Sequence, residues 1–215
     1  MAQIRANSHL YVRWLFIRIL CFCFFAAFLS IAVQIVGLYG QHGILPLSEV
    51  LAQFTNPETK LLAMLTNPSI FWFNSSDNFM RLVCFSGAGL SVLAFCGFFT
   101  GPLIAVMWFL YLSIVSLGQE FMGFQWDSLL LETSLIAIWF APWSAKEIHP
   151  FRKEAFESQA EPSYIFLFLL RLLCFKLMIF SGICKLASGD VAWSDLSAMS
   201  YHYETQPLPT PLSWL

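Results

Sequence analysis

The sequence predicts an all-α fold, a polytopic membrane helical bundle of about five transmembrane helices. Two observations carry this prediction. Hydrophobic residues make up 58% of the chain and charged residues only 11%, whereas about a quarter of the residues in a soluble domain are charged. The apolar residues also gather in runs long enough to cross a bilayer, which takes roughly 20 residues per helix. A chain of this composition cannot cover itself with polar side chains, so its excess apolar surface must face lipid.

The expected spans lie near residues 14–38, 79–99, 102–118, 125–141 and 163–187. The third and fourth form one apolar window of about twice the length of a span, so we divide it near Gly118–Gln125. The first span is too long for a secretory signal, contains Arg18, and is followed by no small-residue cleavage site. We therefore interpret residues 1–187 as a transmembrane domain in which every span is retained.

The distribution of Lys and Arg predicts the orientation, because basic loops stay on the cytoplasmic side. Arg5 and Arg13 precede the first span, and Lys146 and two further basic residues lie between the fourth and fifth. Lys60 is the only lysine or arginine in the loop of residues 39–78. With five spans, both basic segments fall on one side. We expect an integral membrane protein whose N-terminus is cytoplasmic and whose 39–78 loop and C-terminus lie on the far side.

The far-side loop is expected to be structured. Pro46 stands where the first turn of a helix accepts proline, and apolar residues then recur on one helical face. The two Asn-Pro pairs at 56–57 and 67–68 repeat this start signal, since Asn favours a helix N-cap. The sequence therefore predicts short helices that lie at the membrane interface or against the bundle.

Two stripes of small residues predict close packing between membrane helices. Ala26, Ser30 and Gln34 recur every four residues in the first span, and Gly87 and Ser91 do so in the second.

Polar and ionisable residues in the last two spans form the first candidate site, an intramembrane polar network. Its members are Gln125, Asp127, Glu132, Arg171, Lys176 and Lys185. A charge at the bilayer centre costs about 2.5–3.5 kcal/mol, so these groups must pair, lose their charge or contact water. Consecutive membrane helices run antiparallel. We therefore expect Glu132 to pair with Arg171 or Lys176, and Lys185 to pair with Asp127 or Glu120. Gln125 and Glu132 also share one side of their helix, which we expect to face inward.

Two interpretations of this network remain open. A buried set of ion pairs would fix the register of the helices without chemistry of its own. A proton, ion or small-molecule site, in a membrane enzyme or a carrier, would use the same charges. A bundle without a cavity at Asp127 and Glu132 favours the first interpretation, and a wet pocket that reaches them favours the second.

Several other classes of function find no support in the sequence. The six cysteines lie in predicted spans without a CxxC pair, so zinc and redox spacing is absent. His202 and Glu204 make only two metal-ligand candidates. No nucleophile–base spacing or phosphate loop occurs, and the net charge of −2 comes without the basic stripe of a nucleic-acid-binding protein. We predict no catalytic residues, no cofactor and no metal.

The tail of residues 188–215 forms the second candidate site. It follows the helix-ending Gly189 and is rich in aromatic residues of the kind that gather at membrane interfaces. The predicted contact surface consists of Trp193, Tyr201, His202, Tyr203 and Glu204. We expect the tail to pack on the 39–78 loop and to be the start of a further region.

Three stretches together resemble the lipase maturation factor family. They are VQIVGLYGQHGILP (residues 33–46), VSLGQEFMGFQWDSLLLE (115–132) and the long, unusual FKLMIFSGICKLASGDVAWSDLSAMSYHYETQPLPTPLSW (175–214). The resemblance runs over nearly all of the chain and implies a multi-pass protein without established catalytic residues. It implies location in the endoplasmic reticulum membrane, or in the cytoplasmic membrane if the source is bacterial.

The resemblance also implies a function. The best-known family members help secreted dimeric lipases fold into active form, so lipases or other exported proteins are the implied clients, beside the lipid bilayer. Members continue past the Pro-Leu-Ser-Trp stretch into a large far-side domain that is thought to engage the lipase. A weaker architectural likeness to membrane carboxylase-type helical bundles keeps an enzyme as the alternative.

Overall fold

The computed structural model describes residues 2–54 and 56–205, with side chains from residue 9 onward. Throughout these residues the regular structure is helical, as predicted, and the chain divides into two compact units, residues 1–168 and 169–215. Each unit is described by itself. The last ten positions of the predicted tail, 206–215, lie outside the described residues.

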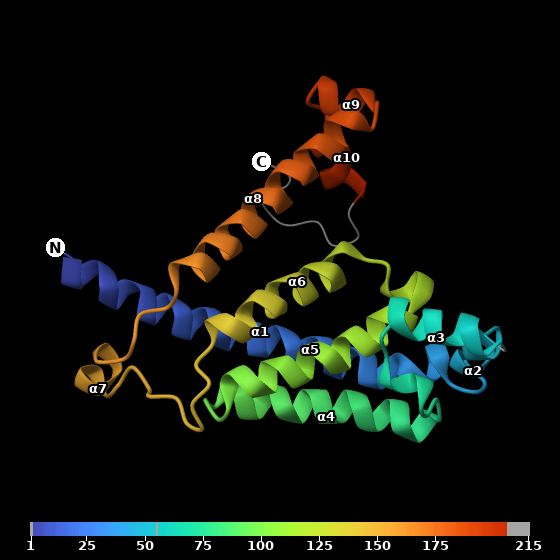
Figure 1. Cartoon of the computed structure of the whole chain (residues 1–215). Coiled ribbons are helices and arrows are strands. Elements are labelled where there is room, and N and C mark those ends of the chain that lie inside the picture. The colour runs from blue at the N-terminus through green and yellow to red at the C-terminus, as the bar shows by residue number, and fades with distance from the viewer. Residues whose placement is uncertain (1, 55, 206–215) are drawn as a thin grey trace. The chain divides into compact units, whose positions relative to one another are not determined.

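Four helices build the first unit (Figure 1): α1 (Ala2–Tyr39), α4 (Asp77–Phe95), α5 (Thr100–Leu117) and α6 (Gln125–Phe140). Helix α4 packs against both α1 and α5, α5 packs on α6, and α1 also touches α5 and α6. Long apolar helices pair in this way because lipid satisfies their outer faces while their inner faces interlock. The result is a bundle whose core lies between α1, α4 and α5.

Shorter elements connect and extend these helices. They are α2 (Leu47–Ala52), α3 (Pro57–Thr66) and η1 (Ile70–Trp72) before α4, η2 (Gln119–Met122) before α6, and α7 (Lys153–Glu157) after it. Helix α8 (Tyr164–Ala187) begins in the first unit and forms the second with α9 (Val191–Ser194) and α10 (Ala198–Thr205).

The predicted helices of the far-side loop are present, although one begins at a different signal. Pro57 is the first residue of α3, as expected. The pair at 67–68 starts no helix, and Asn67 is the C-cap of α3. Instead η1 begins at Ile70, and Ser69 is its N-cap, accepting a hydrogen bond from the backbone N–H of Phe71.

Four segments of the described residues are long and apolar enough to cross a membrane: His9–Tyr39, Asp77–Phe95, Thr100–Leu117 and Tyr164–Ala187. The remaining predicted span is α6, whose 16 residues extend for about 24 Å at 1.5 Å per residue. That is less than the hydrocarbon thickness of about 30 Å. The bundle of apolar helices is confirmed, and the number of five spans stays a prediction.

Helix α6 nevertheless runs antiparallel to α5 along most of its length. The backbone N–H of Gly101 donates to the carbonyl of Pro142 at one end, and the Tyr111 hydroxyl donates to Asp127 Oδ1 toward the other. The 3₁₀ turn η2 lies between the end of α5 and the start of α6 and packs on α5.

The packing face of α1 consists of large side chains spaced at helical intervals. The buried members are Ile17, Cys21, Phe24, Phe28 and Ile35. Opposite them Gly87 leaves space for Phe28, whose ring carbons would lie 2.5–2.6 Å from a Cβ at that position. The Gly87–Ser91 stripe is thus a packing surface, as predicted.

The other predicted stripe, Ala26–Ser30–Gln34, is exposed within the first unit. The packing of α1 in this unit therefore uses large side chains rather than that stripe.

Two hydrogen bonds mark the depth of the bundle. Arg18 donates to the carbonyl of Ala94 at the end of α4, and Tyr39 donates to the carbonyl of Gly118 at the end of α5. Tyr39 follows Arg18 by 21 residues (39 minus 18), which is about 31 Å of helix. This length equals the hydrocarbon thickness of about 30 Å. That is the spacing expected if Arg18 stands near one boundary of the apolar layer and Tyr39 near the other.

The N-terminal part of α1 continues past Arg18 and meets the segment that follows α6. The rings of Tyr11 and Phe156 lie 4.9 Å apart, and Arg13 Nη2 donates to Gln159 Oε1 at 3.3 Å. The two basic segments of the first unit therefore lie at the same end of the bundle. This is the arrangement that the charge distribution requires, and which face of the membrane that end occupies stays a prediction.

Candidate functional site

Asp127, the predicted carboxylate at the start of α6, is buried and bound to a phenol. Tyr111 on α5 donates its hydroxyl to Asp127 Oδ1 at 2.5 Å, and both residues are at most 5% exposed. The rings of Phe24 and Phe28 meet the Tyr111 ring edge-on, at 6.0 and 5.5 Å. Aromatic packing thus fixes the phenol where the carboxylate needs a donor.

Sequence reasoning did not find Tyr111. Its signal was a single hydroxyl in an apolar span, and a buried tyrosine hydroxyl usually has a hydrogen-bond partner.

The other members of the intramembrane polar network lie elsewhere. Gln125 and Glu132 stand on a side of α6 that is exposed in the first unit, while the buried side carries Asp127 and Ser134. Within that unit the inward face of α6 is therefore formed by Asp127 and Ser134 rather than by Gln125 and Glu132. The predicted pairs of Glu132 with Arg171 or Lys176, and of Lys185 with Asp127 or Glu120, stay predictions.

In the second unit the three cations of α8 are exposed. Lys185 Nζ lies 4.8 Å from the centre of the Trp193 ring. An ammonium group over an indole face is attracted by the negative face of the ring. This contact joins a member of the polar network to a member of the predicted contact surface.

A buried ion pair that the sequence did not predict lies at the opposite boundary from Tyr39. Arg18 of α1 binds Glu147, which follows α6, and their side chains are only 9% and 3% exposed. Arg18 Nη1 also donates to the carbonyl of Ala94 at 2.7 Å, and the Thr100 hydroxyl lies 3.3 Å from Glu147 Oε2. The pair therefore ties α1 to the turn between α4 and α5 and to the segment after α6. An arginine in an apolar helix signals that a partner exists, but not where it lies.

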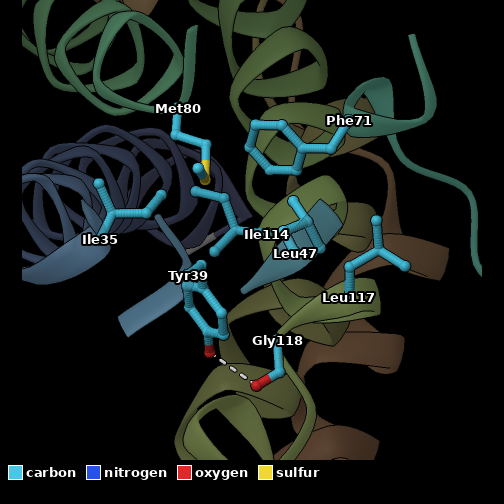
Figure 2. A pocket seen from close by; sticks show the side chains of 8 residues that line it. All are labelled: Ile35, Tyr39, Leu47, Phe71, Met80, Ile114, Leu117 and Gly118. Carbon is cyan, nitrogen blue, oxygen red and sulfur yellow. Dashed lines mark hydrogen bonds between the residues drawn. The ribbon is translucent and has the colours of Figure 1, made fainter. Parts of the chain in front are cut away.

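At the far end the loop helices seat on the bundle around a very small cavity (Figure 2). Its lining residues are Ile35, Tyr39, Leu47, Phe71, Met80, Ile114, Leu117 and Gly118. Its volume of about 10 Å³ holds about one water molecule, whereas ligand sites enclose roughly 300–1,000 Å³. The Ser69 hydroxyl donates to the carbonyl of Ser113 at 2.9 Å. The loop thus forms a cap on α5 rather than a ligand pocket.

The predicted contact surface of the tail contributes to a groove in the second unit. This groove, of about 450 Å³, is lined by α9, α10 and the residues between them, including Trp193, Tyr201 and His202. Tyr203 and Glu204 are exposed beside it. Hydrogen bonds from the hydroxyl and backbone N–H of Ser197 hold the pKa of the Asp195 carboxyl below its usual value. The groove therefore combines aromatic faces with an ionised carboxylate.

Asp127 and Glu132 line neither the small cavity nor the groove of the tail. They are also absent from a third groove, which lies beside Arg18 on the outer side of α1. Among the described residues, no three His, Cys, Asp or Glu side chains are placed to hold a metal ion. The polar contacts of the first unit join helices to one another. Tyr111 and Asp127 connect α5 with α6, and Arg18 and Glu147 connect α1 with the segment after α6.

Comparison with known proteins identifies relatives over almost the whole chain. The model of the lipase maturation factor transmembrane domain matches residues 11–215. The chain is 40% identical to lipase maturation factor 2 of Xenopus laevis, an alignment that covers 87% of this chain and 26% of that relative. It is 36% identical to human lipase maturation factor 2, covering 94% and 29%, and 32% identical to mouse lipase maturation factor 1, covering 99% and 37%. The chain thus spans between about a quarter and two-fifths of these relatives' lengths. No solved structure matches it.

Proposed function

This chain belongs to the lipase maturation factor family, and we propose that it is a membrane-embedded factor that assists the folding of secreted lipases or other exported proteins. The observation that carries the proposal is the family match over residues 11–215. The relatives are named as maturation factors, which supports a role without catalysis. The family match and the apolar helices together make it an integral membrane protein.

We place the protein in the endoplasmic reticulum membrane, where secreted lipases fold, with the Arg18 end of the bundle in the cytoplasm. Lysine and arginine at that end support this orientation, since basic segments remain cytoplasmic. The cap and the tail then face the compartment that holds the client. Both candidate contact regions stand on that side, where a folding chain can meet them.

The client contact is proposed to lie on the tail, at Trp193, Tyr201, His202, Tyr203 and Glu204. Tyr201 and Val191, which both line the groove, are 61% and 69% exposed. Exposed aromatic and apolar side chains that line a groove mark surfaces for other molecules. Tyrosine and tryptophan also give large contact area for little loss of conformational entropy.

The intramembrane polar network is proposed to fix helix register. Tyr111 and Asp127 already join α5 to α6, and a charged pair that uses Glu132 would extend the same principle to α8. Partners of this kind reject slipped arrangements, because a slip would leave a polar group alone in hydrocarbon. The cavities described above are not lined by Asp127 or Glu132, which gives an intramembrane ligand site no support.

The test is secretion of active lipase from cells that lack their own maturation factor. Cells receive a secreted dimeric lipase with this chain, with the Trp193→Ala/Tyr201→Ala variant, or with Phe151→Ala as the matched control. Phe151 is 93% exposed and stands at the Arg18 end of the bundle, outside the proposed contact. The readout is lipase activity per amount of secreted lipase, which separates folding from expression.

Wild type and the control should raise this specific activity, and the double variant should raise it less while remaining equally abundant in the membrane. No increase with the wild-type chain would contradict the proposed function. If the double variant raises the specific activity as much as the wild-type chain does, the client contact does not lie at Trp193 and Tyr201.

A further inference from the structure

An apolar groove with a polar end lies on the outer side of α1 in the first unit. It measures about 610 Å³, and its lining includes Trp14, Arg18, Ile19, Phe22, Phe95 and His149. Ile19, Phe22 and Phe95 are 55%, 61% and 47% exposed. In a bundle that crosses a membrane, such side chains face hydrocarbon, so the apolar part of the groove opens toward lipid.

The groove crosses the boundary of the apolar layer. Arg18, at its floor, lies at the level where α4 ends and α5 begins. Ile19 and Phe22 follow Arg18 along α1 and therefore lie on the hydrocarbon side. Trp14 precedes it by one turn, and His149 packs edge-on against the Trp14 ring at 5.1 Å. The polar end thus stands at the depth of lipid headgroups and the apolar end at the depth of acyl chains.

The polar end offers hydrogen-bond donors. Arg18 is only 7% exposed and has further N–H groups beside those that bind Glu147 and Ala94. Trp14 Nε1 is buried and has no hydrogen-bond partner. At the same end of the bundle lie the cations Arg13 and Lys146, together with further residues of both signs on α7. A phosphate is the anion that arginine recognises best, because the guanidinium fork matches its oxygens.

We propose that this groove binds one glycerophospholipid of the surrounding bilayer. The phosphate lies against Arg18 and Trp14, and one acyl chain runs along Ile19, Phe22 and Phe95. A small turn of the half-buried indole presents its N–H to a phosphate oxygen, which gives the orphaned donor an acceptor. The site is independent of the client contact proposed above, and it distinguishes a held lipid from the lipids that merely surround the bundle.

The experiment is native mass spectrometry of the detergent-purified protein with added dioleoyl phosphatidylglycerol or dioleoylglycerol. The two lipids have the same acyl chains, and only the first has a phosphate. Ile19→Trp fills the groove, and Val33→Trp is the matched control, because Val33 is an 81% exposed residue farther along α1. Trp14→Phe keeps an aromatic ring beside Arg18 and removes the donor. Thermal unfolding of each variant confirms that it folds.

Wild type and Val33→Trp should retain one phosphatidylglycerol, with binding about tenfold tighter than that of dioleoylglycerol, as expected for a charge-assisted hydrogen bond. Ile19→Trp should lose this lipid, and Trp14→Phe should bind it about fivefold more weakly, the usual effect of one hydrogen bond. The proposal is overturned if wild type retains no phospholipid, if both lipids bind equally, or if Ile19→Trp binds as wild type does.

Discussion

Removing one partner of the Arg18–Glu147 pair should destabilise the protein strongly. Removing both partners should cost less than the sum of the two single losses. Breaking a buried ion pair typically costs about 3–5 kcal/mol, because the remaining charge is left without compensation. Both side chains are less than a tenth exposed, so this range applies here. The two substitutions that test the pair are Arg18→Met and Glu147→Gln.

The structure orders the two losses. After Glu147→Gln, Arg18 still donates to the carbonyl of Ala94 at 2.7 Å, so the cost should lie near the lower limit, about 3 kcal/mol. After Arg18→Met, the carboxylate keeps only the longer contact with Thr100, at 3.3 Å, so the cost should approach about 5 kcal/mol. The double variant strands no charge and should lose about 2–3 kcal/mol less than the sum of the two singles.

The assay is reversible unfolding of the purified protein in detergent micelles, with the melting temperature as a second readout. For a chain of this size about 1 kcal/mol corresponds to 2–4 °C, so the single variants should melt roughly 6–20 °C lower. Lys60→Met, at an exposed position of α3, is the control and should change stability by less than about 0.5 kcal/mol. If the two losses add within about 0.5 kcal/mol, the two groups do not stabilise each other and the reasoning fails.

Three further predictions concern the polar residues of the spans and the orientation. Tyr111→Phe should cost about 1–3 kcal/mol, because it leaves the buried Asp127 without its donor; chemical unfolding measures the loss, and an unchanged midpoint would mean that the hydroxyl is dispensable. Glu132→Gln should lower the melting temperature, and neutralising Arg171 or Lys176 as well should recover part of the loss, whereas additive losses with both candidates would exclude the pairing. A glycosylation or protease reporter fused to the C-terminus should read out on the far side, and a cytoplasmic signal would mean an even number of spans.

Composition alone predicted the helical membrane bundle, because the apolar runs exceed anything that a soluble fold of this length can bury. The start of α3 could also be predicted from the sequence, because the signal is local: Pro57 by itself fixes the first backbone angle of a helix. Helix α6 was placed correctly on the sequence, since the span expected at residues 125–141 is observed at Gln125–Phe140.

The contacts that hold the bundle together could not be predicted from a single sequence. Arg18 and Glu147 are 129 residues apart, and nothing in the sequence between them relates the two positions. The sequence predicted the stripe Ala26–Ser30–Gln34 as the packing surface of α1, whereas the structure packs Phe28 against Gly87. Which face is buried depends on the shape of α4, where one glycine makes room for a phenyl ring. Periodicity locates a helix face, whereas complementarity between two helices selects it.

The sequence separation of Arg18 and Glu147 also has a consequence for how the protein is made. Ribosomes add about 5–20 residues per second, so the 129 residues between the two partners take about 6–26 s to synthesise. During that interval α1 is already in the membrane with a guanidinium that lacks its carboxylate. The position of Arg18 at the boundary, rather than the centre, of the apolar layer lets its side chain reach interfacial water while it waits. The arrival of Glu147 then joins α1 to the segment after α6, before α8 has been synthesised.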